Sequence, residues 1–245
     1  MMRPTYFELQ AYVGTTKHMG GMHSTKELIA LCHIGEGQRV LDVGCGVGPT
    51  ACYLVSRHGC CVTGVDLSEA MVAQTRQRSR REGVQDKGEV RVAGARSLCL
   101  ADSALDVAIC ESVITFIEQK AKGLSECVRV TQPGGFVGLN EEVWIAAPAP
   151  TSLAEYVQRT WDIHSEIRTP QDWRKLMADC GLTEVVVRPY RFNAARESSQ
   201  VGRYHLGELA RMFSRLLSLY LRSSEFRRYI RDRHFQPKKL FEYLG

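Results

Sequence analysis

A glycine-rich turn directly follows a short apolar run in the first quarter of the chain. Residues 40–43 are Val-Leu-Asp-Val, and Gly44, Gly46 and Gly48 follow before Pro49. Glycines between a strand and a helix let the backbone approach a ligand closely and point N–H groups at it. A dinucleotide fingerprint would read Gly-x-Gly-x-x-Gly, but the third glycine comes one residue early and Pro49 takes its place. The turn therefore predicts a ligand site and disfavours nicotinamide and flavin.

An acidic residue ends the next apolar run. Residues 62–65 are Val-Thr-Gly-Val, and Asp66 follows them. The carboxyl ends of neighbouring parallel strands meet at one edge of a sheet, so Asp66 is expected beside the glycine turn. A carboxylate there can accept hydrogen bonds from the two vicinal hydroxyls of a ribose. Asp66 is therefore a candidate for recognising the ribose of an adenosine.

Four segments in this order resemble the class I S-adenosylmethionine-dependent methyltransferases, particularly the small-molecule subgroup known as type 11. They are residues 41–48, 64–71, 106–108 and 129–135. The motifs run from about residue 40 to 140, and the strand order extends the resemblance to about residue 190. The resemblance implies an α/β fold with a doubly wound, mostly parallel sheet and helices on both faces. It also implies that S-adenosylmethionine is the cofactor and that a small molecule accepts the methyl group.

The resemblance gives roles to particular residues of this chain. It implies a cradle for the methionine part of the cofactor at Gly44, Cys45 and Gly46, ribose recognition by Asp66, packing on adenine by Leu67 and Met71, and backbone contacts near Cys110 and Glu111. Asp42 belongs to the first motif and is a further candidate for the cofactor site. A carboxylate at that position can instead order the glycine turn by accepting backbone N–H bonds, without touching the ligand.

The chain departs from the family after the third expected strand. The family usually places there an acid that accepts a hydrogen bond from the adenine amino group, whereas this chain reads Ala93-Gly94-Ala95-Arg96. Either backbone groups of Ala95 or Arg96 replace the acid, or the cofactor binds more weakly. The loss of one charge-assisted hydrogen bond would cost about 1–3 kcal/mol. The departure does not overturn the cofactor assignment.

Several acidic and amide side chains follow the fourth and fifth expected strands. Glu111 follows one strand, and Asn140, Glu141 and Glu142 follow the other, at the edge where ligands of such sheets bind. A sulfonium methyl group transfers by in-line displacement, so a base is needed only where the acceptor loses a proton. Glu142 or Glu111 could be that catalytic base. Each could equally be a solvated acid or bind an amine substrate.

A Gly-Gly pair precedes the first expected strand. In similar methyltransferases such a segment folds over the cofactor, so Gly20 and Gly21 are expected to line its methionine end. His18 or Tyr12 would then face the acceptor. The alternative is an ordinary loop with exposed histidines, because histidine is common in loops.

Alternating strands and helices are needed to position these residues. Apolar runs predict strands at residues 39–43, 60–65, 90–93, 105–110, 136–139 and 183–187. Helical patterns occur at residues 6–13, 50–57, 68–81, 117–130, 152–164, 202–221, 226–233 and 237–243, and helix starts are expected at Ser24, with Glu27 as a capping box, and at Thr169-Pro170. The alternation predicts parallel βαβ units with ligands beyond the carboxyl ends of the strands.

Length and composition fit a globular protein. The chain has 245 residues, of which 44% are hydrophobic and 24% charged. No apolar run reaches the ~18–20 residues that a membrane span needs, and the first residues do not form a secretory signal, so a cytoplasmic protein is expected. The 9 cysteines contain no Cys-x-x-Cys pair, which predicts reduced thiols and no metal site.

The basic charge lies in the last part of the chain. Residues 191–245 carry 12 Lys and Arg against 5 Asp and Glu, a net charge of +7. We therefore divide the chain into a cofactor-binding domain at residues 1–190, with an N-terminal helical cap, and a basic helical segment at residues 191–245. This segment is expected to pack on the domain and could cover the substrate mouth. No seventh strand is evident after residue 187, so it is either missing or lies beyond the end of the chain.

Two other functions remain open from the sequence. The basic segment could guide an RNA or protein substrate, with binding that weakens steeply with salt. However, Phe213, Tyr220 and Phe226 lie at helical spacing, which suits packing better than base stacking and disfavours nucleic acid. The chain could also bind S-adenosylmethionine without catalysis. No motif indicates an oligomeric state.

Overall fold

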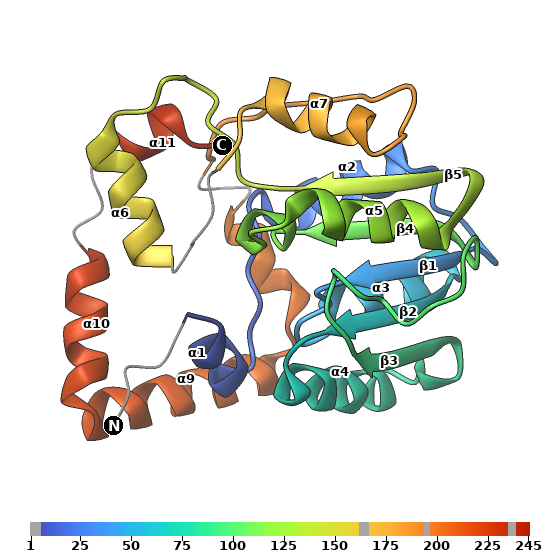
Figure 1. Ribbon diagram of the computed structural model, residues 1–245. Helices are drawn as coiled ribbons and strands as arrows, with labels where there is room; N and C mark the ends of the chain where they lie inside the picture. The colour runs from blue at the N-terminus through green and yellow to red at the C-terminus, as the bar shows by residue number, and fades with distance from the viewer. Residues whose placement is uncertain (1–5, 162–166, 194–196, 235–238) are drawn as a thin grey trace.

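Five parallel strands form the centre of the computed structural model, which describes residues 6–161, 167–193, 197–234 and 239–245. The strands are β1 (Arg39–Val43), β2 (Cys61–Asp66), β3 (Gly88–Val92), β4 (Leu105–Glu111) and β5 (Thr131–Asn140). Their order in the sheet is β3-β2-β1-β4-β5, and all four neighbouring pairs are parallel (Figure 1). The order reverses between β1 and β4, as in a doubly wound fold. The predicted fold class is confirmed.

Helices cover both faces of the sheet. The described helices are α1 (Tyr6–Val13), α2 (Gly21–Leu31), α3 (Pro49–His58), α4 (Glu69–Arg81), η1 (Gln85–Lys87), η2 (Ile114–Phe116), α5 (Lys120–Val130), α6 (Thr151–Trp161), α7 (Pro170–Asp179), η3 (Ser199–Arg203), α9 (Leu206–Arg222), α10 (Ser224–His234) and α11 (Leu240–Tyr243). One apolar cluster joins α2 and α3 to the sheet, and a second joins α5 and α7 to the opposite face. Among the described residues, no helix combines the length and apolar character that crossing a bilayer requires.

The sheet alternates its side chains between these two clusters. Val40 of β1 lies in the α2 and α3 cluster, whereas its neighbour Leu41 lies in the α5 and α7 cluster. A parallel strand buried on both faces must be apolar at successive positions, which is why the strands appear as apolar runs in the sequence. Because the strands are parallel, the carboxyl ends of β1, β2, β4 and β5 meet at one edge of the sheet, where the candidate residues lie.

Two sequence predictions about local structure are wrong. Helix α2 begins at Gly21 with Gly20 as its N-cap, three residues earlier than expected. The Ser24 hydroxyl donates to the carbonyls of Met19 and Gly21 instead of capping the helix. Residues 183–187 do not form a strand, because they pair with no neighbouring strand.

The described residues contain no strand of this sheet after β5. Instead, Trp144 and Leu244 form an isolated antiparallel bridge. Val143 and Gly245 exchange two backbone hydrogen bonds, of 2.8 and 3.0 Å. The last residues of the chain therefore lie beside the segment that leaves β5.

Candidate active site

The glycine turn has the backbone shape that only glycine adopts easily. Gly44 and Gly46 have φ angles of 71° and 56°. A side chain at Gly44 would collide with Val113, and one at Gly46 would collide with Thr16. The N–H groups of Gly44 and Cys45 donate to the carbonyl of Val65, at 2.7 and 3.0 Å. The turn is therefore anchored to β2 and closely covered by two other segments.

Asp66 holds the other side of this turn. Its Oδ2 accepts from the Gly46 N–H at 3.0 Å, and its Oδ1 accepts from the Ser68 N–H at 2.8 Å. Burial raises the pKa of Asp66, and these two N–H groups oppose that rise. Each carboxylate oxygen keeps a further lone pair. The structure thus fixes Asp66 at the edge where the ribose was expected.

The residues expected at the adenine lie beyond Asp66. Leu67 is 78% exposed and lies against Gly94, whereas Met71 is buried in α4. Ala95 is buried in the apolar cluster that includes α5, so its side chain faces the core. Arg96 is exposed, and its guanidinium is 3.4 Å from the Gln119 side-chain oxygen. Ala95 can therefore offer only backbone groups to adenine, and Arg96 has no side-chain acceptor for the adenine amino group.

Asp42 does not order the glycine turn, contrary to that interpretation of the sequence. The N–H groups of the turn donate to the Val65 carbonyl and to the Asp66 carboxylate. Asp42 instead accepts a hydrogen bond from the backbone N–H of Ala51 in α3. Burial, together with the nearby charge of Glu111, raises the pKa of Asp42 to about 7. Its Oδ2 is buried and has no hydrogen-bond partner among the described residues. This oxygen, two residues before Gly44, fits a ligand ammonium group such as that of S-adenosylmethionine.

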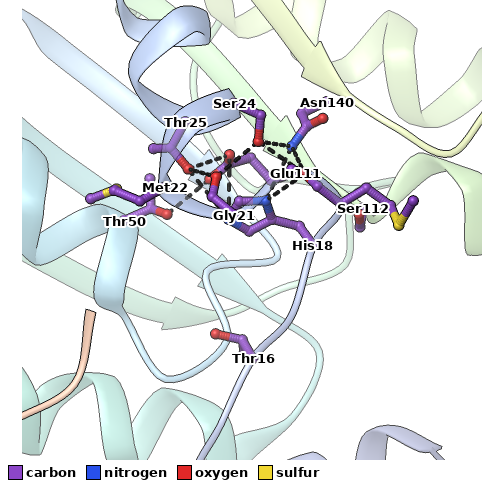
Figure 2. A network of polar contacts seen from close by, with 12 residues as sticks. Thr16, His18, Gly21, Met22, Ser24, Thr25, Thr50, Glu111, Ser112 and Asn140 are labelled. Atoms are coloured by element: carbon purple, nitrogen blue, oxygen red, sulfur yellow. Dashed lines mark hydrogen bonds and ion pairs between the residues drawn. The ribbon is translucent and has the colours of Figure 1, made fainter. Parts of the chain in front are cut away.

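A buried polar network lies at the end of β4, next to the turn. Glu111 accepts hydrogen bonds from the hydroxyls of Thr25 and Thr50, both at 2.8 Å, and its carboxylate is 3.6 Å from His18 Nε2 (Figure 2). Burial raises the pKa of Glu111, but the charge of Arg203 and the hydroxyl donors Thr25 and Thr50 oppose this, and the pKa lies below its ordinary value, so the group stays a carboxylate. A carboxylate with these partners is poorly suited to accept a proton.

Arg203 completes this network and was missed as a site residue by sequence reasoning. It belongs to η3, and its Nη1 donates to His18 Nε2 at 2.5 Å while its Nη2 donates to the Thr50 hydroxyl. Burial lowers the pKa of His18, which favours a neutral ring that can accept this bond. In the sequence Arg203 is one of many basic residues in the last segment, so no local signal marked it.

Two distant segments close over the turn together. The Gly20 N–H donates to Glu197 at 2.6 Å, and the Met22 N–H donates to Ser199 at 3.1 Å. The Thr16 N–H donates to the Tyr204 hydroxyl at 3.0 Å. We call residues 14–25 and 197–204 the cover. Among its residues, Thr16 lies directly over the glycine turn, as its contact with Gly46 shows.

The residues that the sequence predicts to line the methionine end or to face the acceptor do not all lie in the cover. Gly20 has a φ of 77°, and Gly21 is buried at the start of α2. His18 lies in the Glu111 network, and Asn140 donates to the Met19 carbonyl at 3.0 Å. Tyr12 is half exposed on α1, outside this network. The histidine is thus buried rather than part of an exposed loop.

The two acids after β5 differ in their surroundings. Glu141 accepts hydrogen bonds from the backbone N–H groups of Val113, Ile114 and Thr115, at 2.9–3.1 Å, and so holds the loop after β4. Glu142 is buried and accepts from the Ser112 hydroxyl at 2.8 Å. Burial and the neighbouring Glu141 raise the pKa of Glu142 to about 7. Of the two predicted catalytic acids, Glu142 has the properties of a base that works near neutral pH.

The fold and this site define an α/β protein with a candidate ligand site at the switch point of its sheet. Residues 41–139 match the family described as a methyltransferase domain. The matched part of the chain contains the glycine turn, Asp66 and Glu111. This match supports the predicted cofactor, S-adenosylmethionine.

Similar proteins cover different shares of this chain. An uncharacterized protein from Haemophilus influenzae is 29% identical over 178 residues, which are 71% of this chain and 70% of that protein. Phosphoethanolamine N-methyltransferase 1 from Arabidopsis thaliana is 29% identical over 178 residues, or 72% of this chain and 34% of that protein. The chain thus spans about a third of the length of that plant relative. The fold also matches a methyltransferase from Thiobacillus denitrificans in complex with S-adenosylhomocysteine, with a TM-score of 0.73, 20% identity and coverage of 100% of this chain and 96% of that one.

Proposed function

We propose that this protein methylates a small-molecule acceptor that reaches the site beside the Glu111 network. The observation that carries this proposal is the cover, whose two segments, residues 14–25 and 197–204, are joined over the glycine turn by hydrogen bonds. A covered site excludes water and admits a small acceptor more readily than a folded macromolecule. The basic segment at residues 191–245 supplies η3 to this cover.

Residues at the carboxyl edge would hold the cofactor. Asp66 would accept hydrogen bonds from the ribose hydroxyls, and Leu67 and Met71 would flank the adenine. The backbone of the glycine turn, with Asp42, would hold the methionine part. S-adenosylmethionine supplies an electrophilic methyl group on a sulfonium. The remaining work of the protein is to align the acceptor with that group and to take up a proton where the acceptor must lose one.

We assign to Glu142 the role of the base that takes up a proton from the acceptor. Its pKa of about 7 lets it exist as a carboxylate at neutral pH and still hold a proton well. The Ser112 hydroxyl, bonded to Glu142, connects it to the loop whose Val113 touches the glycine turn. Glu111, which the network of Thr25, Thr50 and Arg203 keeps charged, would instead hold the cover in place.

A groove of about 460 Å³ beside the end of β5 offers a route for the acceptor. Its lining includes Trp144, Ile145, Pro170, Tyr190 and Arg191. The Tyr190 hydroxyl donates to Asn140 at 2.7 Å, so one wall of the groove touches the residues under the cover. Trp144 and Tyr190 suit an organic acceptor, and Arg191 favours one that carries a negative charge.

An RNA or protein acceptor is not favoured. Several arginines of the basic segment are bound within the molecule: Arg203 to His18, Arg215 to the carbonyl of Tyr12, and Arg227 to the carbonyl of Tyr220. They are therefore less available to phosphates than the net charge of the segment suggests.

Methyl transfer from labelled S-adenosylmethionine tests the proposal. The protein is incubated with a metabolite extract, and separately with total RNA and with total protein, and low-mass products are separated by ultrafiltration. After chromatography that separates it from S-adenosylmethionine, we expect a new labelled product in the low-mass fraction only when native protein is present. Label confined to RNA or protein would contradict the proposed acceptor class, and binding of the cofactor without any transfer would contradict catalysis.

A further inference from the structure

Helix α9 has a polar side and an apolar side. At helical spacing, Glu208, Arg211, Arg215 and Arg222 fall on one side, together with Gly207, Ser214 and Ser218. The other side consists only of apolar residues: Leu206, Leu209, Ala210, Met212, Phe213, Leu216, Leu217, Leu219, Tyr220 and Leu221. In a surface helix of a globular protein, the apolar side normally faces the core.

One edge of the polar side, where Glu208 and Arg215 lie, faces the rest of the molecule instead, whereas Arg211 and Arg222 farther round this side are exposed. Glu208 accepts from Arg78 and from Arg81 of α4, both at 2.8 Å. Arg215 donates to the carbonyl of Tyr12 in α1 at 2.9 Å. Figure 1 shows α9 at the periphery, running below α1 and joining α10. These contacts fix the rotation of the helix and turn its apolar side outward.

The exposed side chains confirm this orientation. Leu206 is 85% exposed, Phe213 and Leu221 are each 68% exposed, and Leu217 is 45% exposed. We call these four residues the outer face of α9. A continuous exposed apolar surface on a helix is uncommon in monomeric soluble proteins and marks a binding surface.

Exposed basic residues occur on the same two helices. Arg211 and Arg222 lie on the polar side of α9, and Arg228 and Arg231 lie on α10. A helix with its side chains is ~10–12 Å across, comparable with the Debye length of ~8 Å at physiological salt, so charges on the polar side of α9 still act at the outer face. A helix that combines an exposed apolar side with basic residues is typical of binding to a membrane surface.

We propose that the outer face of α9 binds the surface of a membrane that contains anionic lipids. The apolar side chains would enter the boundary between headgroups and acyl chains, and the arginines would lie near the lipid phosphates. A second copy of the chain suits this surface less well. A two-fold interface would bring the same patch of both copies together and so place arginines opposite arginines. The inference does not depend on the identity of the methyl acceptor.

Sedimentation with lipid vesicles tests the inference. The full chain is mixed with vesicles of phosphatidylcholine alone, or of phosphatidylcholine with phosphatidylglycerol, at low and at high salt. We expect binding to the phosphatidylglycerol vesicles that weakens at high salt. The double variant Phe213→Ser/Leu217→Ser should lower the partition constant at least about tenfold, because two exposed apolar side chains no longer enter the lipid. Arg211→Gln/Arg222→Gln should lower it about fivefold per charge.

The control variant Val92→Ser/Val186→Ser removes two exposed valines from elsewhere on the surface and should bind vesicles as the parent does. Circular dichroism and binding of S-adenosylhomocysteine verify that every variant is folded. The proposal is overturned if the parent does not bind phosphatidylglycerol vesicles, or if Phe213→Ser/Leu217→Ser binds them equally well. A dimer in light scattering that this variant abolishes would overturn it in favour of a second copy.

Discussion

The Nη1 atom of Arg203 lies 2.5 Å from Nε2 of His18, although 185 residues separate the two in the sequence. His18 precedes the first strand of the sheet, and Arg203 follows the last. The contact places a positive charge beside Glu111, whose carboxylate is buried at the end of β4. The Glu111 network is therefore complete only when the segments that carry His18 and Arg203 have both folded onto the sheet.

Removing the charge of Glu111 should destabilise the fold because Arg203 is left without its counter-charge. For Glu111→Gln we expect a loss of about 3 kcal/mol in the free energy of unfolding near neutral pH, measured by urea denaturation. The pKa of Glu111 is lowered in the folded state, so its contribution is present above the ordinary carboxyl pKa and is lost as the pH falls. The variant should therefore approach the parent in acid.

The double variant Glu111→Gln/Arg203→Met should recover part of the stability, since it removes both charges. The exposed pair Arg129 and Asp102 serves as the control, and Asp102→Asn should change stability by less than about 1 kcal/mol. If the losses of the two single variants at Glu111 and Arg203 simply add, the two charges are not coupled.

A side chain at Gly20 should disturb the cover. The residue has a φ of 77°, and an added Cβ would lie 2.6 Å from the Tyr190 hydroxyl oxygen and 2.8 Å from Ser24 Cβ. We expect Gly20→Ala to cost about 1–2 kcal/mol of stability and to weaken the binding of S-adenosylhomocysteine in calorimetry. Gly202 is the matched control, because a Cβ there meets no atom within 4 Å. Equal affinity in the two alanine variants would exclude the Gly20 segment from the cofactor site.

Much of the sheet could be predicted from the sequence because its signals are local. Buried parallel strands such as β1 are apolar at successive positions, and helix starts such as Ser68 and Thr169 carry side-chain caps that the structure contains. The start of α2 was missed because its N-cap, Gly20, makes no side-chain bond. The segment at residues 183–187 has the composition of a strand, but a strand also needs a neighbour to pair with, which composition does not reveal.

The candidate site was only partly predictable for a related reason. Asp66 and Gly46 lie 20 residues apart, at the carboxyl ends of neighbouring parallel strands, and their contact follows from that strand order. Arg203, Glu197 and Tyr204 reach the site across 177–188 residues, and no pattern of spacing specifies such contacts. Glu141 and Glu142 are adjacent acids with different neighbours, so their different environments could be found only in the structure.

Replacing Asp66 should weaken cofactor binding much more than it changes the fold. Asp66→Asn keeps the shape of the side chain and one acceptor for the Gly46 N–H, but it removes the charge that the ribose hydroxyls would meet. We expect the dissociation constant for S-adenosylhomocysteine to rise about 10- to 100-fold in calorimetry, as for a lost charge-assisted hydrogen bond. Asp86→Asn, at an exposed position in η1, should bind as the parent does. An unchanged constant for Asp66→Asn would refute its assignment to the ribose.

Glu142 should make both stability and turnover depend on pH near neutrality. Its folded pKa of about 7 lies above the ordinary glutamate value of 4.5, so its contribution to stability is full below pH 4.5 and is lost as the pH rises through 7. Glu142→Gln should match the parent near pH 5 and exceed it near pH 8 by on the order of 3 kcal/mol in urea denaturation.

For an acceptor that loses a proton, parent turnover should rise with a midpoint near pH 7, because Glu142 must be ionised to act as the base. The same variant should then be about 100-fold slower or worse above that pH, with S-adenosylhomocysteine affinity unchanged. Glu118→Gln, an exposed neighbour, is the control and should keep the parent profile. A stability gain in Glu142→Gln without any loss of turnover would mean that this carboxyl is buried next to the site but takes no part in the reaction.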